Sequence, residues 1–431
     1  MNRLNRLPLL KLSQDRFVRN LSWMGLSEVG IRVSRLVATV ILARFLTDQD
    51  YGLAAIVLTT HQFIRVFTRN GILNKIIQAD DADVDEICKT AYWLNWMLSG
   101  VLFVGQVAIA FLIAAAYDNA SLIMPICAIA ATYLVYPLGL VQAALVQRQN
   151  RMRVWSLANL LQVGTDNLLT GLFALLGMGM WAIVLPKLLT APILVVVVWR
   201  HCNWRPVYGF TLKKWRNIIN FGTRVLGVEW LTTLRENIDY LLIGRFLSIE
   251  ALGVYYFAFN AGLGISLSVI NAIKISLYPD LCKARTDWQR LRGRYVSGLK
   301  TIAKVIVPLV VLQSCLAPVY VPIVFGEKWV TQGAVPILIL ICLSAIPRPF
   351  ADAASLLLRA VDKPQLELRW NVIFTTLLAG SVIVGAQWGI QGVAIAVFAI
   401  HVGVLPLYAW LTSRYVSHFA KLASPPTAVS L

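Results

Sequence analysis

The sequence predicts an all-helical membrane protein with twelve transmembrane helices, arranged as two parallel repeats of six helices each. Of its 431 residues, 58% are hydrophobic and 14% are charged, and apolar runs long enough to cross a bilayer recur from end to end. A motif at residues 43–53 returns at residues 244–254, with Arg, Phe, Leu and Gly each shifted by 201 positions. Internal repeats of this kind are common in membrane transporters.

Twelve apolar segments have the length of a membrane span, because about 20 residues of helix cross ~30 Å of hydrocarbon. The expected spans are residues 22–46, 51–76, 90–116, 121–147, 154–176, 180–199, 219–247, 251–278, 301–325, 333–358, 367–385 and 389–413. They divide the chain into a cytoplasmic N-terminal segment (1–21), an N-terminal six-helix bundle (22–199), a cytoplasmic linker (200–218), a C-terminal six-helix bundle (219–413) and a cytoplasmic tail (414–431).

Lysine and arginine gather in alternate loops between these spans. The segments on the side of the N-terminus contain 25 of them, counting Arg369 at the start of the span 367–385, whereas the opposite loops contain Lys328 alone. Basic residues are retained on the cytoplasmic side, so both termini are expected in the cytoplasm and the number of spans is expected to be even. The net charge of +18 therefore reflects membrane orientation rather than a surface for nucleic acid.

A second pair of matching segments supports two halves in the same orientation. Pro137 and residues 177–182 match Pro349 and residues 389–394, in both cases at an offset of 212. With six spans in each half, the repeat is parallel, about an axis near the membrane normal.

Several function classes are excluded by what the chain lacks. The longest external loop, residues 326–332, is too short to supply a catalytic site for an external substrate. The four histidines and six cysteines show no metal-ligand spacing, and no phosphate-loop or dinucleotide fingerprint occurs. We therefore expect no catalytic residue, no metal and no cofactor. Energy for transport would come from an H+ or Na+ gradient, or from the gradient of the substrate itself.

Charged residues at membrane depth are the candidate functional residues, because burying a charge in a bilayer is costly. Glu28, Arg32 and Arg35 follow i, i+4 and i+7 spacing on one face of the first span, and Arg32 lies about 15 Å deep. The candidates for substrate binding are Arg32, Arg35, His61, Arg65, Arg224, Arg235 and Arg348, and the candidates for ion coupling or ion pairing are Glu28, Glu229, Asp239 and Asp352.

These charges cannot face lipid, so we expect them to line a water-filled central cavity. Arginines exceed carboxylates among them, and the planar guanidinium suits phosphate, which predicts an anionic or phosphate-bearing passenger. The alternative is that they form ion pairs that hold the halves together, for example Glu28–Arg32 or Arg235–Asp239. For Asp166 and Lys187, in other spans, a polar contact is favoured over a coupling-ion site.

Short motifs follow one another along nearly the whole chain. They are Ala43-Arg44-Phe45-Leu46, Tyr51-Gly52, Asn70-Gly71-Ile72, Ile77-Gln78, Ala143-Ala144-Leu145-Val146-Gln147-Arg148, Gly177-Met178-Gly179-Met180-Trp181-Ala182, Asn237-Ile238-Asp239-Tyr240-Leu241-Leu242-Ile243-Gly244, Tyr278-Pro279 and Phe325-Gly326-Glu327-Lys328-Trp329. Their order resembles that of bacterial polysaccharide transporters, the Wzx-type flippases. These belong to the multidrug/oligosaccharidyl-lipid/polysaccharide exporter (MOP) superfamily, which also contains the MATE transporters.

The resemblance implies two six-helix bundles around a central cavity that opens alternately to either side of the membrane. It implies a multi-pass protein of the bacterial inner membrane that moves undecaprenyl-pyrophosphate-linked oligosaccharides for exopolysaccharide, capsule or O-antigen synthesis. The partners would be the bilayer, the lipid-linked oligosaccharide, and the polysaccharide polymerase and glycosyltransferases of the same pathway.

Two other functions remain as alternatives. A MATE-like, ion-coupled multidrug antiporter belongs to the same superfamily, but a few acidic residues should then dominate a cavity that contains fewer arginines. Export of a cationic dye would favour this alternative. A membrane polysaccharide polymerase or ligase would need a large external loop for its chemistry, and the chain has none.

Overall fold

The computed structural model describes residues 16–423 except 70–71, 82, 207–214 and 285–286. Throughout these residues the chain forms helices joined by short turns, without a β-strand. It divides into two compact units, Met1–Thr233 and Leu234–Leu431, and the boundary falls inside the helix Trp215–Phe246. The predicted all-helical class is confirmed.

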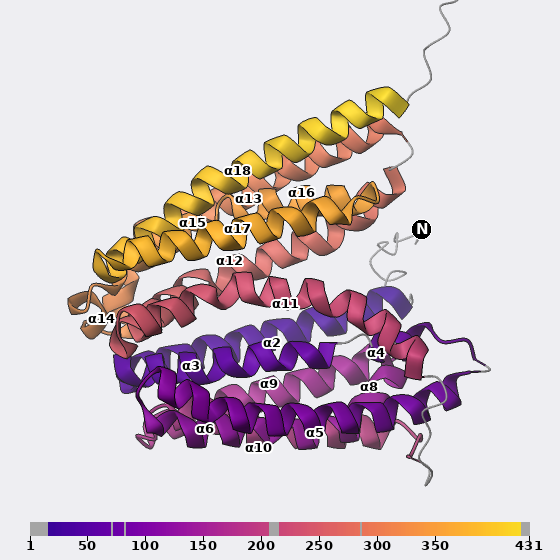
Figure 1. Ribbon diagram of the computed structural model, residues 1–431, viewed down its shortest axis with the longest axis horizontal. Helices are drawn as coiled ribbons and strands as arrows, with labels where there is room; N and C mark the ends of the chain where they lie inside the picture. Colours follow the sequence, from indigo (N-terminus) through magenta and orange to yellow (C-terminus); the bar gives the residue numbers. More distant parts are fainter. Residues whose placement is uncertain (1–15, 70–71, 82, 207–214, 285–286, 424–431) are drawn as a thin grey trace, which may run out of the picture. The chain divides into compact units, whose positions relative to one another are not determined.

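The first unit is built on a few long helices with shorter helices between them. Within it, α2 runs alongside α9, and α10 packs against both α8 and α9 (Figure 1). Its elements are α2 (Arg16–Phe45), α3 (Asp48–Arg65), η1 (Val66–Arg69), α4 (Ile72–Gln78), α5 (Val84–Ala116), η2 (Ala120–Leu122), α6 (Ile123–Ala130), α7 (Thr132–Val135), α8 (Pro137–Arg148), α9 (Met152–Leu175), α10 (Trp181–His201) and most of α11 (Trp215–Phe246).

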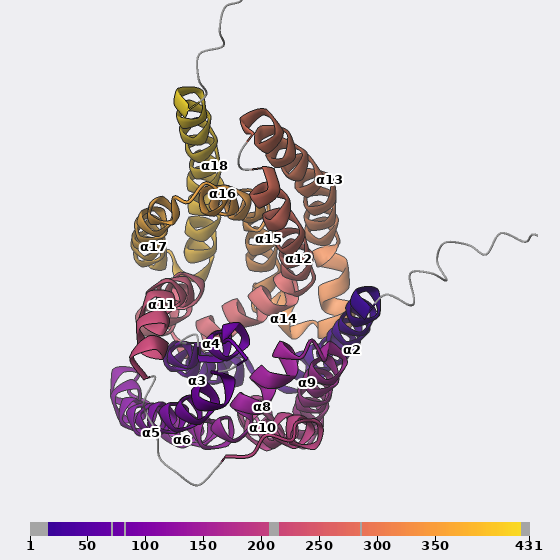
Figure 2. The same cartoon turned by 90° about the vertical axis from the view of Figure 1, so that its right-hand side faces the viewer.

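The second unit begins within α11 and contains the remaining helices. In it, α12, α13 and α15 pack against one another, and α18 lies beside α16 and α17 (Figure 2). Its further elements are α12 (Ile249–Ala284), α13 (Trp288–Tyr320), the π-helical turn η3 (Val321–Phe325), α14 (Lys328–Thr331), α15 (Ala334–Ser344), α16 (Arg348–Ala360), α17 (Pro364–Ala386) and α18 (Gly389–Ala423).

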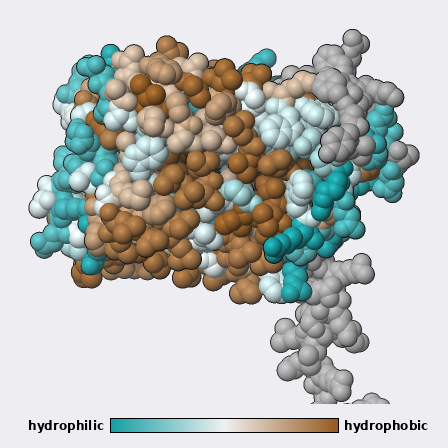
Figure 3. Space-filling model, turned by 90° about the horizontal axis from the view of Figure 1, so that it is seen from below, coloured by the Kyte–Doolittle hydropathy of each residue, from teal (hydrophilic) through white to brown (hydrophobic). Residues whose placement is uncertain are grey.

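The helices carry the apolar surface of a membrane protein. Within the described residues, six helices or helix runs are long and apolar enough to cross a bilayer, and a bent pair, Ala120–Val135 with Pro137–Arg148, would make a seventh. On α5, Val101, Phe111 and Leu112 are each more than half exposed. Figure 3 shows a broad band of hydrophobic residues between hydrophilic ends. Water would penalise such a surface, whereas lipid accommodates it, so the chain is a multi-pass membrane protein.

Three of the expected continuous spans are interrupted, which corrects the sequence prediction. The span 51–76 breaks after Arg65, where the hydroxyl of Thr68 donates to the carbonyl of Arg65 at 2.7 Å. The span 121–147 bends by 52° before Pro137. The span 333–358 remains one apolar run, Ala334–Ala360, but it is not helical at residues 345–347, just before Arg348. Proline lacks an N–H and clashes with the preceding turn, which explains the second and third interruptions.

The expected loop 279–300 is also mostly helical. Helix α12 continues to Ala284, and α13 begins at Trp288 after Asp287, whose side chain accepts from the backbone N–H of Arg290 at 3.1 Å. Among the basic residues counted there as loop charge, Lys283 therefore stands on α12, and Arg290, Arg292, Arg294 and Lys300 stand on α13; Arg285 lies outside the described residues. A carboxylate that caps the first turn explains why the helix starts at this point.

The two copies of the 43–53 motif form the same turn. Helices α2 and α11 end at Phe45 and Phe246, and α3 and α12 begin after Thr47 and Ser248, again 201 positions apart. Thr47 Oγ1 accepts from the N–H of Asp50, and Ser248 Oγ accepts from the N–H of Ala251, both at 3.1 Å. A hydroxyl residue at the N-cap satisfies a helix donor that would otherwise remain unpaired.

The segments at an offset of 212 also share backbone conformation. Asn150 and Asp362, after α8 and α16, have φ angles of 54° and 62°, and Gly177 and Gly389 have φ angles of 73° and 72°. Left-handed residues end helices at places where the chain must turn sharply, so the matched positions carry matched turns.

Candidate functional site

Helix α2 carries the first set of candidate charges, Glu28, Arg32 and Arg35, on one face. Arg32 Nη2 lies 3.2 Å from Glu28 Oε1, and both side chains are about half exposed, at 40% and 52%. Arg35, one turn further along, is also exposed. The Glu28–Arg32 pair, foreseen as an alternative to substrate binding, is thus present, but it leaves both groups accessible.

The other two faces of α2 explain why the charges stand where they do. One face packs on α9, where Ser34 Oγ accepts from the amide of Asn167 at 2.9 Å and a side chain at Gly30 would collide with Leu160. Another face is apolar and exposed, with Leu26 and Val33 at 63% and 58%. Residues 28, 32 and 35 fall between these two faces because successive helix positions turn by about 100°.

His61 lies in a buried hydrogen-bonded network on α3. Its Nδ1 is 3.1 Å from Gln106 Oε1 on α5, and Gln106 donates to the carbonyl of Ile126 at 2.9 Å. The hydroxyl of Tyr133 donates to the His61 carbonyl at 3.4 Å, and the two rings lie 5.2 Å apart. These contacts hold His61 in the interior of the first unit, where a buried polar group needs a partner.

Arg65 follows His61 by one helical turn and is partly exposed at the end of α3. It interacts electrostatically with Tyr133 and with Tyr136 at the start of α8. A second polar pair lies in the same unit, where Lys187 Nζ on α10 is 3.1 Å from Asp166 Oδ2 on α9. The polar contact expected for Asp166 and Lys187 is confirmed, and the two residues pair with each other.

The second unit gathers the most connected candidate residues around Asp239 on α11, which is 6% exposed. The hydroxyl of Tyr255 on α12 donates to Asp239 Oδ2 at 2.8 Å, and the backbone N–H of Tyr240 donates to Oδ1 at 3.0 Å. Tyr240 packs edge-on against Tyr255, with ring centroids 5.9 Å apart. Apolar rings around a hydrogen-bonded carboxylate exclude water from it and strengthen its electrostatic interactions.

Arg348, the first residue of α16, is the cation of this cluster. It interacts electrostatically with Asp239, Tyr255 and Arg235, and its guanidinium lies 5.7 Å from the ring centre of Phe259. Within the described part of the chain, its Nε is buried without a hydrogen-bond partner. A buried N–H donor in that state is a ready site for an oxygen of a ligand or a water molecule.

Arg235 extends the cluster towards α17 and α18. Its Nη1 donates to Asn371 Oδ1 at 3.0 Å, not to Asp239. Beside Asn371, the ring of Trp370 stacks on Tyr408, with ring centres 4.7 Å apart. His401, 5% exposed on α18, interacts electrostatically with both Arg348 and Arg235. Five helices, α11, α12, α16, α17 and α18, thus supply one polar cluster lined by aromatic rings.

The remaining candidates lie at the margins of these groups. Asp352 follows Arg348 by one turn of α16 and is partly exposed, as is Glu229 on α11 in the first unit. The side chain of Arg224 lies outside the described residues. The structure therefore brings Arg235, Asp239 and Arg348 together, and separately Glu28 with Arg32 and His61 with Arg65.

Sequence reasoning missed several residues of both networks, among them Gln106, Tyr255, Asn371 and Tyr408. Each is a polar or aromatic residue within an apolar helix, at a position with no charge to mark it. The only available signal was the rule that a buried charge needs hydrogen-bond partners, which predicts that partners exist without identifying them. Across the described residues, no three His, Cys, Asp or Glu side chains are grouped as metal ligands would be.

Comparison with known proteins identifies the family to which the chain belongs. A family model described as "Polysaccharide biosynthesis protein" matches residues 41–333. The teichuronic acid biosynthesis protein TuaB of Bacillus subtilis (strain 168) is 27% identical over 373 residues, which are 85% of this chain and 76% of TuaB. The succinoglycan biosynthesis transport protein ExoT of Rhizobium meliloti (strain 1021) is 23% identical over 408 residues, which are 92% of this chain and 80% of ExoT.

Solved structures with the same fold include two kinds of transporter. An inward-facing multidrug resistance MATE family transporter of the MOP superfamily aligns with a TM-score of 0.71 and 16% identity, covering 94% of this chain and 96% of the transporter. The lipid II flippase MurJ, in an inward closed conformation, aligns with a TM-score of 0.72 and 14% identity, covering 91% of this chain and 87% of MurJ. The resemblance drawn from the short motifs is confirmed. Because the family model covers more than half of the sequence, the chain belongs to the polysaccharide biosynthesis protein family.

Proposed function

We propose that the protein is a flippase that moves undecaprenyl-pyrophosphate-linked oligosaccharides across the bacterial inner membrane by alternating access. The product would serve exopolysaccharide, capsule or O-antigen synthesis. The observation that carries the proposal is Arg348, a guanidinium with a buried unpaired Nε inside an apolar-coated helical unit. A phosphate oxygen would satisfy that donor, and the protein itself would perform no covalent chemistry.

The relatives support a lipid-linked sugar as the passenger. TuaB and ExoT carry names from polysaccharide biosynthesis, and the name of ExoT includes transport. MurJ, which shares the fold, is a flippase for lipid II. Transfer of a sugar-bearing lipid between leaflets is a function that fits both the polysaccharide biosynthesis relatives and the flippase that shares the fold.

A finer architecture belongs to the same proposal. It consists of twelve spans in two parallel six-helix bundles around a central cavity, with domain boundaries as predicted from the sequence and both termini in the cytoplasm. Its support is the pair of matched turns at an offset of 201, the matched left-handed residues at 212, and the strong bias of basic residues to alternate loops.

The proposed roles of the charges follow their chemistry. Arg32, Arg35, Arg65, Arg224, Arg235 and Arg348 would bind the pyrophosphate, with His61 as a further polar candidate near Arg65. Glu28, Glu229, Asp239 and Asp352 would pair with these arginines or bind the coupling H+ or Na+. The polymerase and glycosyltransferases of the pathway would be the protein partners.

Reconstitution tests the function directly. The purified protein is placed in liposomes with a fluorescent undecaprenyl-pyrophosphate-linked oligosaccharide in one leaflet, and its appearance in the other leaflet is measured with a membrane-impermeant lectin or quencher. The expected result is protein-dependent transfer, which is absent from empty liposomes. Normal insertion of the protein without any transfer would overturn the proposal.

A multidrug antiporter is the second candidate, and the similarity to the MATE fold favours it. The same liposomes, loaded with ethidium and given an H+ or Na+ gradient, distinguish the two functions. Ethidium export without transfer of the lipid-linked oligosaccharide would establish the antiporter in place of the flippase.

A further inference from the structure

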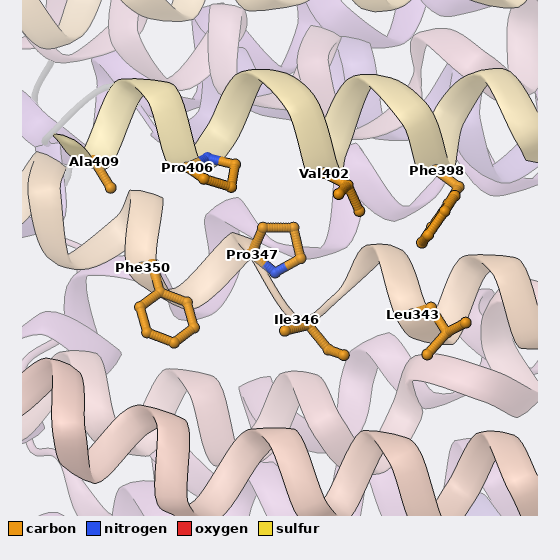
Figure 4. Close-up of a pocket in the computed structure, with 8 residues that line it drawn as sticks. All are labelled: Leu343, Ile346, Pro347, Phe350, Phe398, Val402, Pro406 and Ala409. Carbon is orange, nitrogen blue, oxygen red and sulfur yellow. The ribbon is translucent and has the colours of Figure 1, made fainter. Parts of the chain in front are cut away.

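A pocket in the second unit, between the non-helical residues 345–347 and α18, is lined only by apolar residues (Figure 4). No side chain in its wall is polar, so nothing there selects one occupant. A pocket in the first unit, here called the arginine pocket, has a charged wall. It has a volume of about 470 Å³ and lies between the start of α8, the end of α10 and the residues that follow α10. The residues that line it are Leu138, Val195, Val196, Trp199, Arg200 and Arg205.

Hydrogen bonds at the end of α10 hold the wall of the arginine pocket. The indole N–H of Trp199 donates to the carbonyl of Leu138 at 2.6 Å, which joins α10 to α8. Arg205 Nη1 donates to the carbonyl of Cys202 at 2.6 Å, and its Nη2 donates to the carbonyl of Trp199 at 3.0 Å. The guanidinium lies 4.8 Å from the ring centre of Trp199. Because the last carbonyls of a helix have no partner within it, these contacts fix Arg205 at the pocket.

Both arginines of the pocket remain available to an anion. Arg205 makes no hydrogen bond through Nε with any described residue. Arg200, in the last turn of α10, has neither a hydrogen bond nor an ion pair among the described residues, and both arginines are exposed. No residue that lines the pocket is acidic, and residues 207–214, outside the described part, contain no Asp or Glu. Two arginines in a pocket without a carboxylate match a phosphate group.

An exposed apolar stripe of α10 leads to Arg200. Leu189, Pro192 and Val196 precede it at intervals of three and four residues, so all four share one face of the helix. All are exposed, and α10 is long and apolar enough to cross a bilayer. From Leu189 to Arg200 the helix rises about 16 Å, close to the ~15 Å of hydrocarbon in one leaflet. An acyl chain on this stripe therefore has its headgroup level with Arg200.

We propose that the arginine pocket binds the headgroup of an anionic phospholipid from the leaflet expected on the cytoplasmic side. The phosphate lies between Arg200 and Arg205, and one acyl chain follows the stripe from Val196 to Leu189. Arginine and tryptophan together are typical of the level at which headgroups meet hydrocarbon, and cytoplasmic leaflets carry anionic lipid. The inference goes beyond the proposed function and does not rest on what the protein transports.

Charge and depth favour this occupant over two other lipids. Phosphatidylcholine carries an ammonium group of its own, which the neighbouring guanidiniums repel. The undecaprenyl chain of the proposed substrate is far longer than the stripe, which matches the hydrocarbon of one leaflet. Val196 and Arg200 line the pocket and also lie on the stripe, so the headgroup and its chain occupy connected surfaces.

The test measures binding of radiolabelled phosphatidylglycerol to the full-length protein in nonionic detergent, with phosphatidylcholine as the reference lipid. The wild type should prefer phosphatidylglycerol at least about tenfold. Arg200→Gln should weaken phosphatidylglycerol binding about fivefold and leave phosphatidylcholine binding within about twofold. Arg200→Gln combined with Arg205→Gln should weaken phosphatidylglycerol binding about 30-fold.

The matched control is Arg294→Gln, which removes the same charge from an exposed position of α13 that does not line the pocket. It should change phosphatidylglycerol binding less than about twofold. A loss equal to that of Arg200→Gln would mean that net charge alone attracts the lipid, and the site would be refuted. If the double variant does not fold, Arg200→Gln decides the role of charge, because Arg200 has no hydrogen bond or ion pair with a described residue to lose.

The apolar wall is tested separately from the charge. Val196→Trp fills the pocket and should weaken phosphatidylglycerol binding at least about tenfold. Leu168→Trp, on α9 at a position that is 67% exposed and outside the pocket, should leave binding within about twofold. If Val196→Trp does not fold, Val196→Ala removes part of the wall without added bulk and should weaken binding about threefold. Unchanged binding in the Val196 variant would refute the path of the acyl chain.

Competition identifies the source of the phosphate. Unlabelled phosphatidylglycerol should displace the label, whereas equal concentrations of undecaprenyl phosphate or glycerol 3-phosphate should not. Equally effective displacement by undecaprenyl phosphate would assign the pocket to the transported lipid, and displacement by glycerol 3-phosphate would reduce it to a site for a free anion. Either result, or equal affinity for phosphatidylglycerol and phosphatidylcholine, would overturn the proposal. None of these outcomes bears on liposome transfer of the lipid-linked oligosaccharide, which tests the proposed function by itself.

Discussion

Tyr255 on α12 donates a hydrogen bond of 2.8 Å to Asp239 on α11, and the same carboxylate interacts with Arg348 on α16. The hydrogen bond joins two consecutive helices, and the interaction with Arg348 links them to a helix about 100 residues further along the chain. It also leaves Asp239 with defined donors on both oxygens, since the N–H of Tyr240 serves the other one. A buried carboxylate held in this way orients the cation beside it.

Removing the donor should weaken the second unit. Tyr255→Phe leaves a buried carboxylate oxygen without its hydroxyl partner, which costs about 1–3 kcal/mol of unfolding free energy. Titration with SDS, followed by circular dichroism, measures this quantity. Tyr256→Phe is the matched control because Tyr256 is only partly buried, and the hydrogen bond that the Asn260 amide donates to its backbone carbonyl at 2.8 Å is kept in the variant, so its loss should be smaller. Equal losses in the two variants would argue against a special role for the Asp239 contact.

Arg348 should be needed for transport rather than for folding. Arg348→Lys keeps the charge but loses the planar fork and Nε, and we expect export of surface polysaccharide to fall at least about tenfold, the effect of losing about 1.4 kcal/mol of binding. Export in a strain lacking the native gene, normalised to protein in the membrane, measures the effect.

The control for this prediction is Arg359→Lys, later on the same helix. Arg359 donates to both oxygens of Glu367 at 2.6 and 2.7 Å, so its replacement should lower the amount of protein while leaving export per molecule unchanged. Export that survives Arg348→Lys at the wild-type rate would remove Arg348 from the substrate path.

The Glu28–Arg32 pair can be separated into a structural and a transport role by exchanging its partners. Glu28→Arg combined with Arg32→Glu restores an ion pair at the same i, i+4 spacing, so the free energy of unfolding should change by less than about 1 kcal/mol. If Arg32 binds phosphate, export should nevertheless be lost, because a carboxylate now occupies its position. Full export by the exchanged protein would mean that the pair is structural only.

The turn between α9 and α10 should depend on Gly179. Its φ is 55°, and a Cβ there would lie 2.6 Å from Asp50 Oδ1, the carboxylate that also accepts from the N–H of Met180. Gly179→Ala should therefore lower the free energy of unfolding by the ~1–2 kcal/mol that alanine costs in the left-handed conformation. It should also disrupt the hydrogen bond from the N–H of Met180 to Asp50. Gly177 has φ 73°, and a Cβ added there would have no atom within 4 Å. Gly177→Ala therefore measures the cost of the backbone conformation alone. Equal unfolding free energies of the two variants would contradict a role for Asp50.

The sequence was sufficient for the helical class and for the turns that repeat, because these depend on local signals. Apolar runs set the helices, and Thr47 and Ser248 mark the start of α3 and α12 by a hydroxyl that any N-cap would use. The breaks before Pro137 and Arg348 were less predictable, since proline permits a kink and packing decides whether it forms.

The partners within the clusters could not be predicted. Asp239 and Tyr255 are 16 positions apart on two helices, and their contact depends on how each helix is turned towards its neighbour. Helical periodicity predicts which residues lie on the same face of a helix, but it does not predict which neighbouring helix that face contacts. For the same reason Arg235 was expected beside Asp239 yet donates to Asn371 on α17.

The three faces of α2 restrict how this helix can move. Turning it about its own axis by about 100° would carry Arg32 and Arg35 onto the hydrocarbon-facing side or press them against α9. Either outcome exposes charge to lipid or buries it unpaired, at a cost of several kcal/mol. The arrangement therefore opposes rotation of α2 about its own axis, whereas tilting or sliding of the helix keeps each face in its own surroundings.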